Sequence, residues 1–226
     1  MTQVVQMDGA PTPVVSRSVD RISRRQVDKF TERRAQLAES ALLTLSELGY
    51  ARTSLREIAQ NSEFSHGVLH YYFRDKVDLI THCVREYKAR CVTRYDQIAA
   101  SAATADELRL GFAAGLAQTM VQDAHLHRLW YDLRGQSMFE ASFRDDVAAI
   151  DASLERMIWR IVSQYSEQLG APPAVSPATA YAMFDGLFQH GLIQHLFGHE
   201  DAADRLRDAV ERMLPTMVQS ASTAPR

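Results

Sequence analysis

The side chains best suited to a chemical role form a polar cluster in the first third of the chain. The cluster consists of Ser65, His66, Gly67, His70 and Tyr71. Its hydroxyl and imidazole groups can hydrogen-bond phosphates or the edges of nucleic-acid bases. Gly67 has no side chain, so the backbone there can approach such a partner closely. On the exposed face of a helix, this cluster predicts contact with nucleic acid.

Two short helices and a longer one are predicted around this cluster. Ser54 and Glu57 have the spacing of a capping box, in which each satisfies a free amide at the start of a helix. Ser65 can cap a second short helix about three residues after the first one ends. Asp75 then begins a longer helix that continues to about residue 95. Two short helices joined in this way are typical of a helix-turn-helix, whose second member enters the major groove of DNA.

The rest of the chain is also predicted to be helical. Before Gly49, which should end a helix, apolar residues recur every three or four positions and so share one face. They are Leu37, Ala38, Ala41, Leu42, Leu45 and Leu48. Further helices are predicted over residues 105–122, 124–134, 140–168, 177–197 and 201–219. No convincing stretch shows the period-two alternation of a half-buried strand, so the predicted fold class is all-α.

Composition and charge narrow the class of protein. The chain has 226 residues, of which 46% are hydrophobic and 23% are charged, as in ordinary globular proteins. No apolar run approaches membrane-spanning length and no signal peptide is evident, so we expect a cytoplasmic protein without a membrane partner. Cys83 and Cys91 are expected to be free thiols. Residues 1–95 carry 15 Lys and Arg against 11 Asp and Glu, whereas residues 96–226 carry 10 against 17. A basic N-terminal part suits a protein that presents that end to phosphates.

Residues 53–80, TSLREIAQNSEFSHGVLHYYFRDKVDLI, resemble the signature of the TetR (TetR/AcrR) family of bacterial transcriptional regulators. The matching residues are Thr53, Ile58, Ala59, Ser65, Gly67, Leu69, Tyr72, Phe73 and Lys76. Two positions depart from the family pattern. Ser62-Glu63 replaces the usual Ala-Gly of the turn, which predicts either modest backbone strain at Glu63 or a different turn. His70 replaces a tyrosine that commonly helps to hold DNA.

The resemblance implies an N-terminal three-helix helix-turn-helix domain and a C-terminal helical domain for ligand binding and dimerisation. The predicted divisions are a flexible basic arm (1–27), the DNA-binding domain (28–74), the ligand-binding and dimerisation domain (75–219) and a flexible tail (220–226). The arm is either a simple tail or a segment that follows the DNA backbone. The DNA-binding candidates are Thr53, Ser54, Arg56, Ser65, His66, Gly67, His70, Tyr71, Tyr72 and Lys76. Lys76 resembles the family's phosphate-contacting lysine.

Aromatic and sulfur-containing side chains gather in the middle helices. Most are expected in the core, but some could line a pocket for an apolar or amphipathic ligand. The pocket candidates are Trp130, Met138, Phe139 and Trp159. The last two predicted helices would either complete the monomer core or pair with a second copy in a four-helix bundle. The dimerisation candidates are Ala182, Leu187, Gly191 and Leu192.

The sequence leaves three hypotheses about the function. The leading hypothesis is a homodimeric regulator, in the simplest case a repressor, that binds a palindromic operator in double-stranded DNA and is released by a small-molecule effector. An all-helical enzyme is the second, but the chain has no Gly-rich phosphate loop and no nucleophile elbow. A DNA-binding dimer without an effector is the third. His195 and His199 have a spacing that could hold a metal, yet no Cys or carboxylate pattern accompanies them. We therefore expect no enzymatic activity, no cofactor and no metal site.

Overall fold

The computed structural model describes residues 15–219, and it describes side chains from residue 27 onward except at Ala51. Apart from one isolated bridge between Pro173 and Val218, the regular structure of this part of the chain is helical, which confirms the all-α fold class. The elements are α1 (Val15–Arg52), α2 (Leu55–Gln60), α3 (His66–Tyr72), α4 (Lys76–Arg94), α5 (Asp96–Ser101), α6 (Ala105–Gln122), α7 (Ala124–Gln136), η1 (Ala141–Phe143), α8 (Arg144–Leu169), α9 (Pro177–Leu196), α10 (Ala202–Met213) and η2 (Leu214–Met217).

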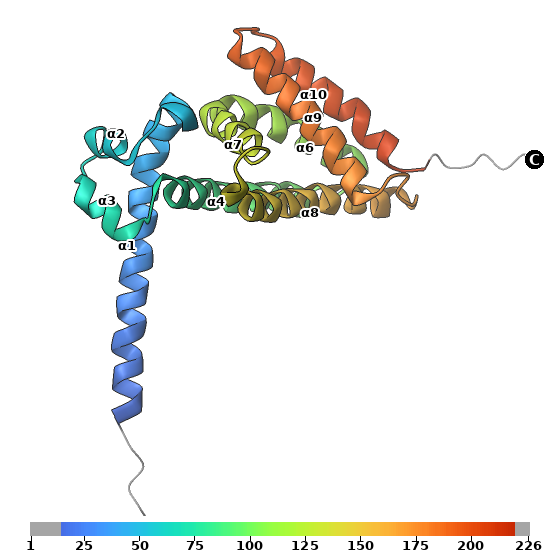
Figure 1. Cartoon of the computed structure of the whole chain (residues 1–226). Coiled ribbons are helices and arrows are strands. Elements are labelled where there is room, and N and C mark those ends of the chain that lie inside the picture. The colour runs from blue at the N-terminus through green and yellow to red at the C-terminus, as the bar shows by residue number, and fades with distance from the viewer. Residues whose placement is uncertain (1–14, 220–226) are drawn as a thin grey trace, which may run out of the picture.

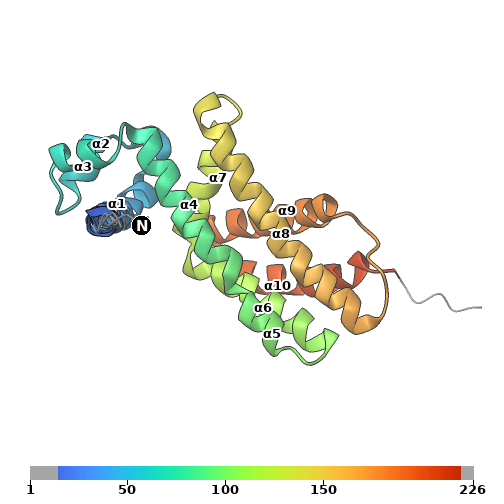
Figure 2. The ribbon, with the colours of Figure 1, turned by 90° about the horizontal axis from the view of Figure 1, so that it is seen from below.

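The helices form two groups joined by α4 (Figures 1 and 2). α2 and α3 pack on α1 at one end, and the first part of α1 projects away from the rest of the molecule. α4 and α8 run side by side, and α9 and α10 form a hairpin that packs on α6 and α8. Residues 15–27, predicted to be flexible, are instead helical. The remainder of the predicted arm and the predicted tail lie outside the described residues.

Local sequence signals position the helix-turn-helix. One face of α1 is buried at all the predicted apolar positions except Leu48, which directly precedes the bend at Gly49 and is exposed. The capping box of Ser54 and Glu57 is present, and Ser65 caps α3 through the backbone amide of Val68. The turn between α2 and α3 avoids the strain predicted at Glu63, because every residue with positive φ in the described chain is a glycine.

Gly49 makes the bend at the end of α1, with φ 75° and ψ 172°. This backbone region is essentially restricted to glycine. A Cβ atom at this position would also lie 3.3 Å from a carboxylate oxygen of Asp132. The turn therefore depends on glycine for two separate reasons.

We expect Gly49→Ala to lower the free energy of unfolding by about 1–3 kcal/mol, because the new residue must adopt a disfavoured conformation. For a chain of this size, the melting temperature should fall by roughly 2–4 °C for each kcal/mol. Gly135→Ala is the matched control, since Gly135 lies in a helix and its Cβ would meet nothing within 4 Å. Equal melting temperatures for the two variants would contradict the role given to Gly49.

Candidate nucleic-acid interface and interior cavity

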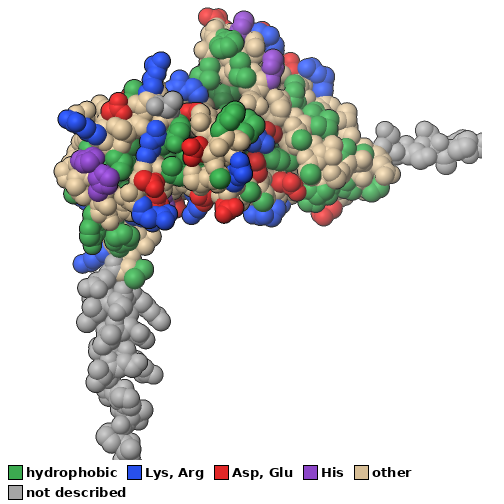
Figure 3. Space-filling view, in the orientation of Figure 1, with side chains coloured by type: hydrophobic (Ala, Val, Ile, Leu, Met, Phe, Trp, Pro, Cys, Tyr) green, Lys and Arg blue, Asp and Glu red, His purple; other side chains and the backbone are tan. Residues whose placement is uncertain are grey.

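The exposed face of α3 carries the polar cluster. Ser65, His66, Gly67, His70 and Tyr71 are all exposed. Histidine side chains gather over α3 in the space-filling view, with Lys and Arg side chains nearby (Figure 3). On the opposite face of the helix, Leu69 is fully buried, and Phe73 directly after the helix is almost so. α3 is thus anchored by apolar contacts while its polar face stays open.

The residues at the start of α2 differ in their access to solvent. Ser54 and Arg56 are exposed, as DNA contact requires. The prediction for the side chain of Thr53 is wrong, because it is 3% exposed and its hydroxyl donates to the carbonyl of Gly49 at 2.7 Å. Thr53 therefore fastens α2 to the end of α1.

Lys76 also faces inward. Its ammonium donates to the carbonyl of Tyr50 at 2.5 Å and lies 3.9 Å from the centre of the Tyr50 ring. Burial lowers the pKa of Lys76. The predicted phosphate contact thus requires the ammonium to leave this carbonyl.

An aromatic group supports the end of α3. Tyr72 is half-buried, and its ring lies 4.8 Å from that of Phe30 on α1. The exposed ring of Tyr71 meets Phe30 edge-on at 6.1 Å. Phe30 was not among the sequence candidates, because the predicted apolar face of α1 started only at Leu37.

The second candidate site is a cavity of about 60 Å³ between α4, α6, α7, α8 and α9. Trp130, which is 1% exposed, lines it as the sequence predicts. The other three pocket candidates do not. Met138 and Phe139 follow α7 and are 71% and 83% exposed, and Trp159 lies on α8 outside the cavity lining. The chain leaves the core soon after Gly135, so local hydrophobicity misplaced both Met138 and Phe139.

The polar lining of the cavity was not predicted from the sequence. Lys88 on α4 is 4% exposed and lies on the same buried stripe as Val84 and Cys91. This spacing could have indicated the burial of Lys88 in the sequence, because a lysine on the apolar face of a helix must either be buried or extend past its neighbours to solvent. Burial lowers the pKa of Lys88 to about 8.

A hydrogen-bonded chain leads away from Lys88. His127 on α7 is buried, and its Nδ1 lies 3.4 Å from the Lys88 ammonium. Burial and the nearby Lys88 charge lower the pKa of His127 to about 2, so the ring is neutral. Its Nε2 lies 3.2 Å from the hydroxyl of Tyr87, which donates to Asp123 at 3.3 Å. Lys88 therefore reaches a carboxylate only through two intervening side chains.

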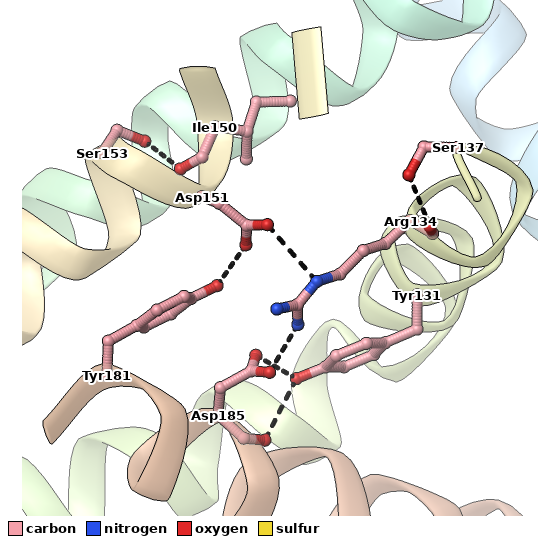
Figure 4. Close-up of polar contacts among 8 residues, drawn as sticks. All are labelled: Tyr131, Arg134, Ser137, Ile150, Asp151, Ser153, Tyr181 and Asp185. Atoms are coloured by element: carbon pink, nitrogen blue, oxygen red, sulfur yellow. Dashed lines mark hydrogen bonds and ion pairs between the residues drawn. The ribbon is translucent and has the colours of Figure 1, made fainter. Parts of the chain in front are cut away.

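Three helices meet at an ionic network beside the cavity (Figure 4). Arg134 of α7 pairs with Asp185 of α9 at 2.5 Å and with Asp151 of α8 at 3.4 Å. Tyr131 donates to Asp185 at 2.9 Å, and Tyr181 donates to Asp151 at 2.5 Å. The network links α7, α8 and α9 through one arginine.

α7 also holds the end of α1. Arg128 donates to the carbonyls of Ser46 and Glu47, and Asp132 accepts from the backbone amide of Tyr50 at 2.8 Å. Trp130, from the same helix, lines the cavity. The same helix therefore lines the cavity and contacts the end of α1, on which the helix-turn-helix packs.

The dimerisation candidates separate into two pairs. Gly191 and Leu192 are buried within the monomer, which corrects their predicted role. A Cβ at Gly191 would lie 3.1 Å from the sulfur of Met120 and 3.4 Å from Leu206, so this glycine permits close packing of α9 on α6 and α10. Ala182 is exposed and Leu187 is half-buried, which leaves both available to a partner.

Residues 15–219 offer neither a clustered metal site nor a membrane span. No three His, Cys, Asp or Glu residues in that range are grouped so as to hold a metal ion. None of the helices described there is long and apolar enough to cross a membrane.

Comparison with known proteins agrees with the geometry. Residues 37–83 match the family described as bacterial regulatory proteins, tetR family. The HTH-type transcriptional regulator BetI of Burkholderia thailandensis is 30% identical over 168 residues, which cover 71% of this chain and 82% of that protein.

Solved structures share the fold. FadR from Bacillus subtilis, in complex with stearoyl-CoA, superposes with a TM-score of 0.67 at 18% identity, over 81% of this chain and 98% of that one. A structure from Saccharomonospora viridis in complex with choline, described as that of a transcriptional regulator, has a TM-score of 0.66 at 18% identity, over 84% and 100% of the two chains. Together with the exposed α3, the sequence matches identify the chain as a member of the TetR family, whose members are transcriptional regulators that bind DNA and are not enzymes.

Proposed function

We propose that this protein is a homodimeric, effector-responsive regulator that binds a palindromic operator, in the simplest case as a repressor. The observation that carries the proposal is the exposed polar face of α3, with Gly67 at its centre. Function on DNA in a bacterial cell implies a cytoplasmic location. Effector binding in the cavity would shift the molecule toward a state in which the two copies of α3 no longer fit successive major grooves.

Coupling between the sites is supported by α7. An effector that enlarges the cavity must displace Trp130 or its neighbours. The same helix holds the last turns of α1 through Arg128 and Asp132. A movement of α7 would therefore change the position of the helix-turn-helix relative to the second subunit.

Dimerisation is supported by the outer face of α9. This face carries exposed small and apolar residues at helical spacing, among them Ala182, Gly186 and Ile193, and the exposed ring of Phe197 follows the helix. Such a patch is typical of an interface between helices of two subunits.

We expect Ile193→Asp to shift the protein from dimer to monomer, because a carboxylate would be buried in the interface without a partner. Sedimentation at micromolar concentration measures the change. Leu43→Asp is the control, since Leu43 is an exposed leucine on α1. A stable dimer in both variants would remove α9 from the interface.

Operator binding tests the function directly. The protein should retard DNA from the promoter next to its own gene more strongly than a random duplex. Failure of the full chain to prefer any such site would overturn the proposal.

Salt dependence tests the contribution of Arg56, which is exposed on α2. We expect Arg56→Ala to weaken binding to all sequences and to reduce the slope of log K against log salt by about one, because one phosphate contact is lost. Arg156→Ala on α8 should leave the slope unchanged. An unaltered slope in Arg56→Ala would remove this arginine from the DNA contacts.

A further inference from the structure

Among the described residues of the cavity wall, Lys88 is the one charged side chain without an opposing ion in contact. Three carboxylates that contact this part of the core are already engaged by arginines, Asp123 by Arg94 and both Asp151 and Asp185 by Arg134. Within the described chain, the hydrogen-bond partner of the Lys88 ammonium is the neutral ring of His127 at 3.4 Å. The ring centre of Trp130 lies 5.2 Å from the same ammonium.

A buried ammonium in this position is unfavourable unless something compensates for its lost hydration. The low pKa of Lys88 reflects the same loss. An anion that entered the cavity would supply the missing partner through a charge-assisted hydrogen bond. A cation would meet Lys88 with like charge, and Asp185 could receive it only by giving up Arg134.

The remainder of the wall is largely apolar. Leu116, Leu154, Ile158, Phe184 and Phe188 line the cavity together with Trp130. We propose that the cavity is the site for a small organic monoanion, a carboxylate on an apolar body, with the carboxylate on Lys88 and the body against these side chains. The inference rests on the proposed function in one respect only, namely that a ligand binds here at all.

The size of the site makes binding a conformational event. A cavity of about 60 Å³ is too small for an organic acid as it stands, so such a ligand must push side chains apart. A neighbouring open groove of about 440 Å³ shares Tyr131 and Asp185 with the cavity wall. The ionic network of Arg134 therefore forms the partition that the acid would open on its way in.

Matched ligands test the charge of the preferred ligand. Benzoate, benzamide and benzylamine share a ring, and hexanoate, hexanamide and hexylamine share a chain, but the members of each series differ in charge. With the full-length protein at pH 7, we expect at least one acid to raise the melting temperature by several degrees, and the corresponding amide and amine to have little effect. Calorimetry should give a dissociation constant at least about 10-fold lower for that acid than for its amide.

Variants test the role of Lys88. Lys88→Met should abolish the shift caused by the acid, whereas Arg156→Met, at an exposed basic residue of α8, should retain it. Three results would each overturn the proposal: no shift with either acid, a shift at least as large with an amide or amine, or an undiminished shift in Lys88→Met.

Gel shift with the operator separates this inference from the proposed function. If the acid binds through Lys88 but does not release DNA, the anion site stands and the effector response fails. If neither acid binds while the protein still holds its operator, the anion site fails and DNA binding stands.

Discussion

Gly67→Glu should lower operator affinity by at least about 100-fold, or roughly 2.7 kcal/mol, while the melting temperature stays within a few degrees of the wild type. A Cβ at Gly67 would meet no atom closer than the Ser65 hydroxyl at 4.0 Å, so the folded protein accommodates a side chain. On DNA, the same side chain would add bulk and negative charge where α3 approaches the groove.

The control is the same change at Gly135, which lies on α7 and also has free space where a Cβ would stand. Gly135→Glu should bind the operator like the wild type. Fluorescence anisotropy with labelled operator measures both affinities at one salt concentration. If Gly67→Glu bound as tightly as Gly135→Glu, α3 would not be the helix that reads DNA.

Lys88→Met should make the ligand-free protein more stable at pH 7, by up to about 3 kcal/mol. Burial lowers the pKa of Lys88 from 10.5 to about 8, and a difference of that size corresponds to roughly 3 kcal/mol against the charged form in the folded state. Methionine has a similar length and carries no charge, so the cost disappears.

The stabilisation by Lys88→Met should depend on pH, and the lowered pKa of Lys88 fixes the direction of that dependence. Below pH 8, Lys88 is protonated in both the folded and the unfolded protein, so the full cost is present. Between about pH 8 and 10.5 the unfolded chain binds more protons than the folded one, so wild-type stability gains with rising pH from this group. The groups that act on Lys88 are Cys91, Asp185, Arg94 and Asp151, and all of them remain in the variant.

The stability difference between Lys88→Met and the wild type should therefore shrink as pH rises from 7 to 10. Urea unfolding at several pH values measures this stability difference. Tyrosine titration occurs in both proteins and therefore cancels from the difference. A difference that stayed constant over this range would mean that Lys88 is not a buried ammonium.

Local patterns predicted the helices well, because caps and helical periodicity act over a few residues. The capping box at Ser54, the cap at Ser65 and the span 105–122 all appear in the structure. The site was harder to predict. The cavity is lined from five helices that are distant in sequence, and of the four residues that the sequence suggested only Trp130 lies there. Gly191 shows the same limit, since its small size serves α6 and α10 of its own chain rather than a partner.

Residue type alone also misplaced individual side chains, both polar and apolar. Thr53 matches a family position, but its hydroxyl has a nearby carbonyl to bond and is buried. Met138 and Phe139 are hydrophobic, but the chain turns outward after α7 and exposes them. Whether a side chain is available depends on neighbours that no short stretch of sequence contains.

The hydrogen bonds between α7 and the end of α1 determine which amino-acid substitutions this contact tolerates. Arg128 and Asp132 contact main-chain atoms of Ser46, Glu47 and Tyr50 rather than their side chains. Substitution of the exposed Glu47 should therefore leave the proposed coupling intact, whereas replacement of Arg128 or Asp132 should yield proteins that still bind DNA and ligand but no longer couple the two. In a saturation screen for variants that no longer release DNA, substitutions should accordingly be found at Arg128 and Asp132 of α7 and not at Glu47 of α1.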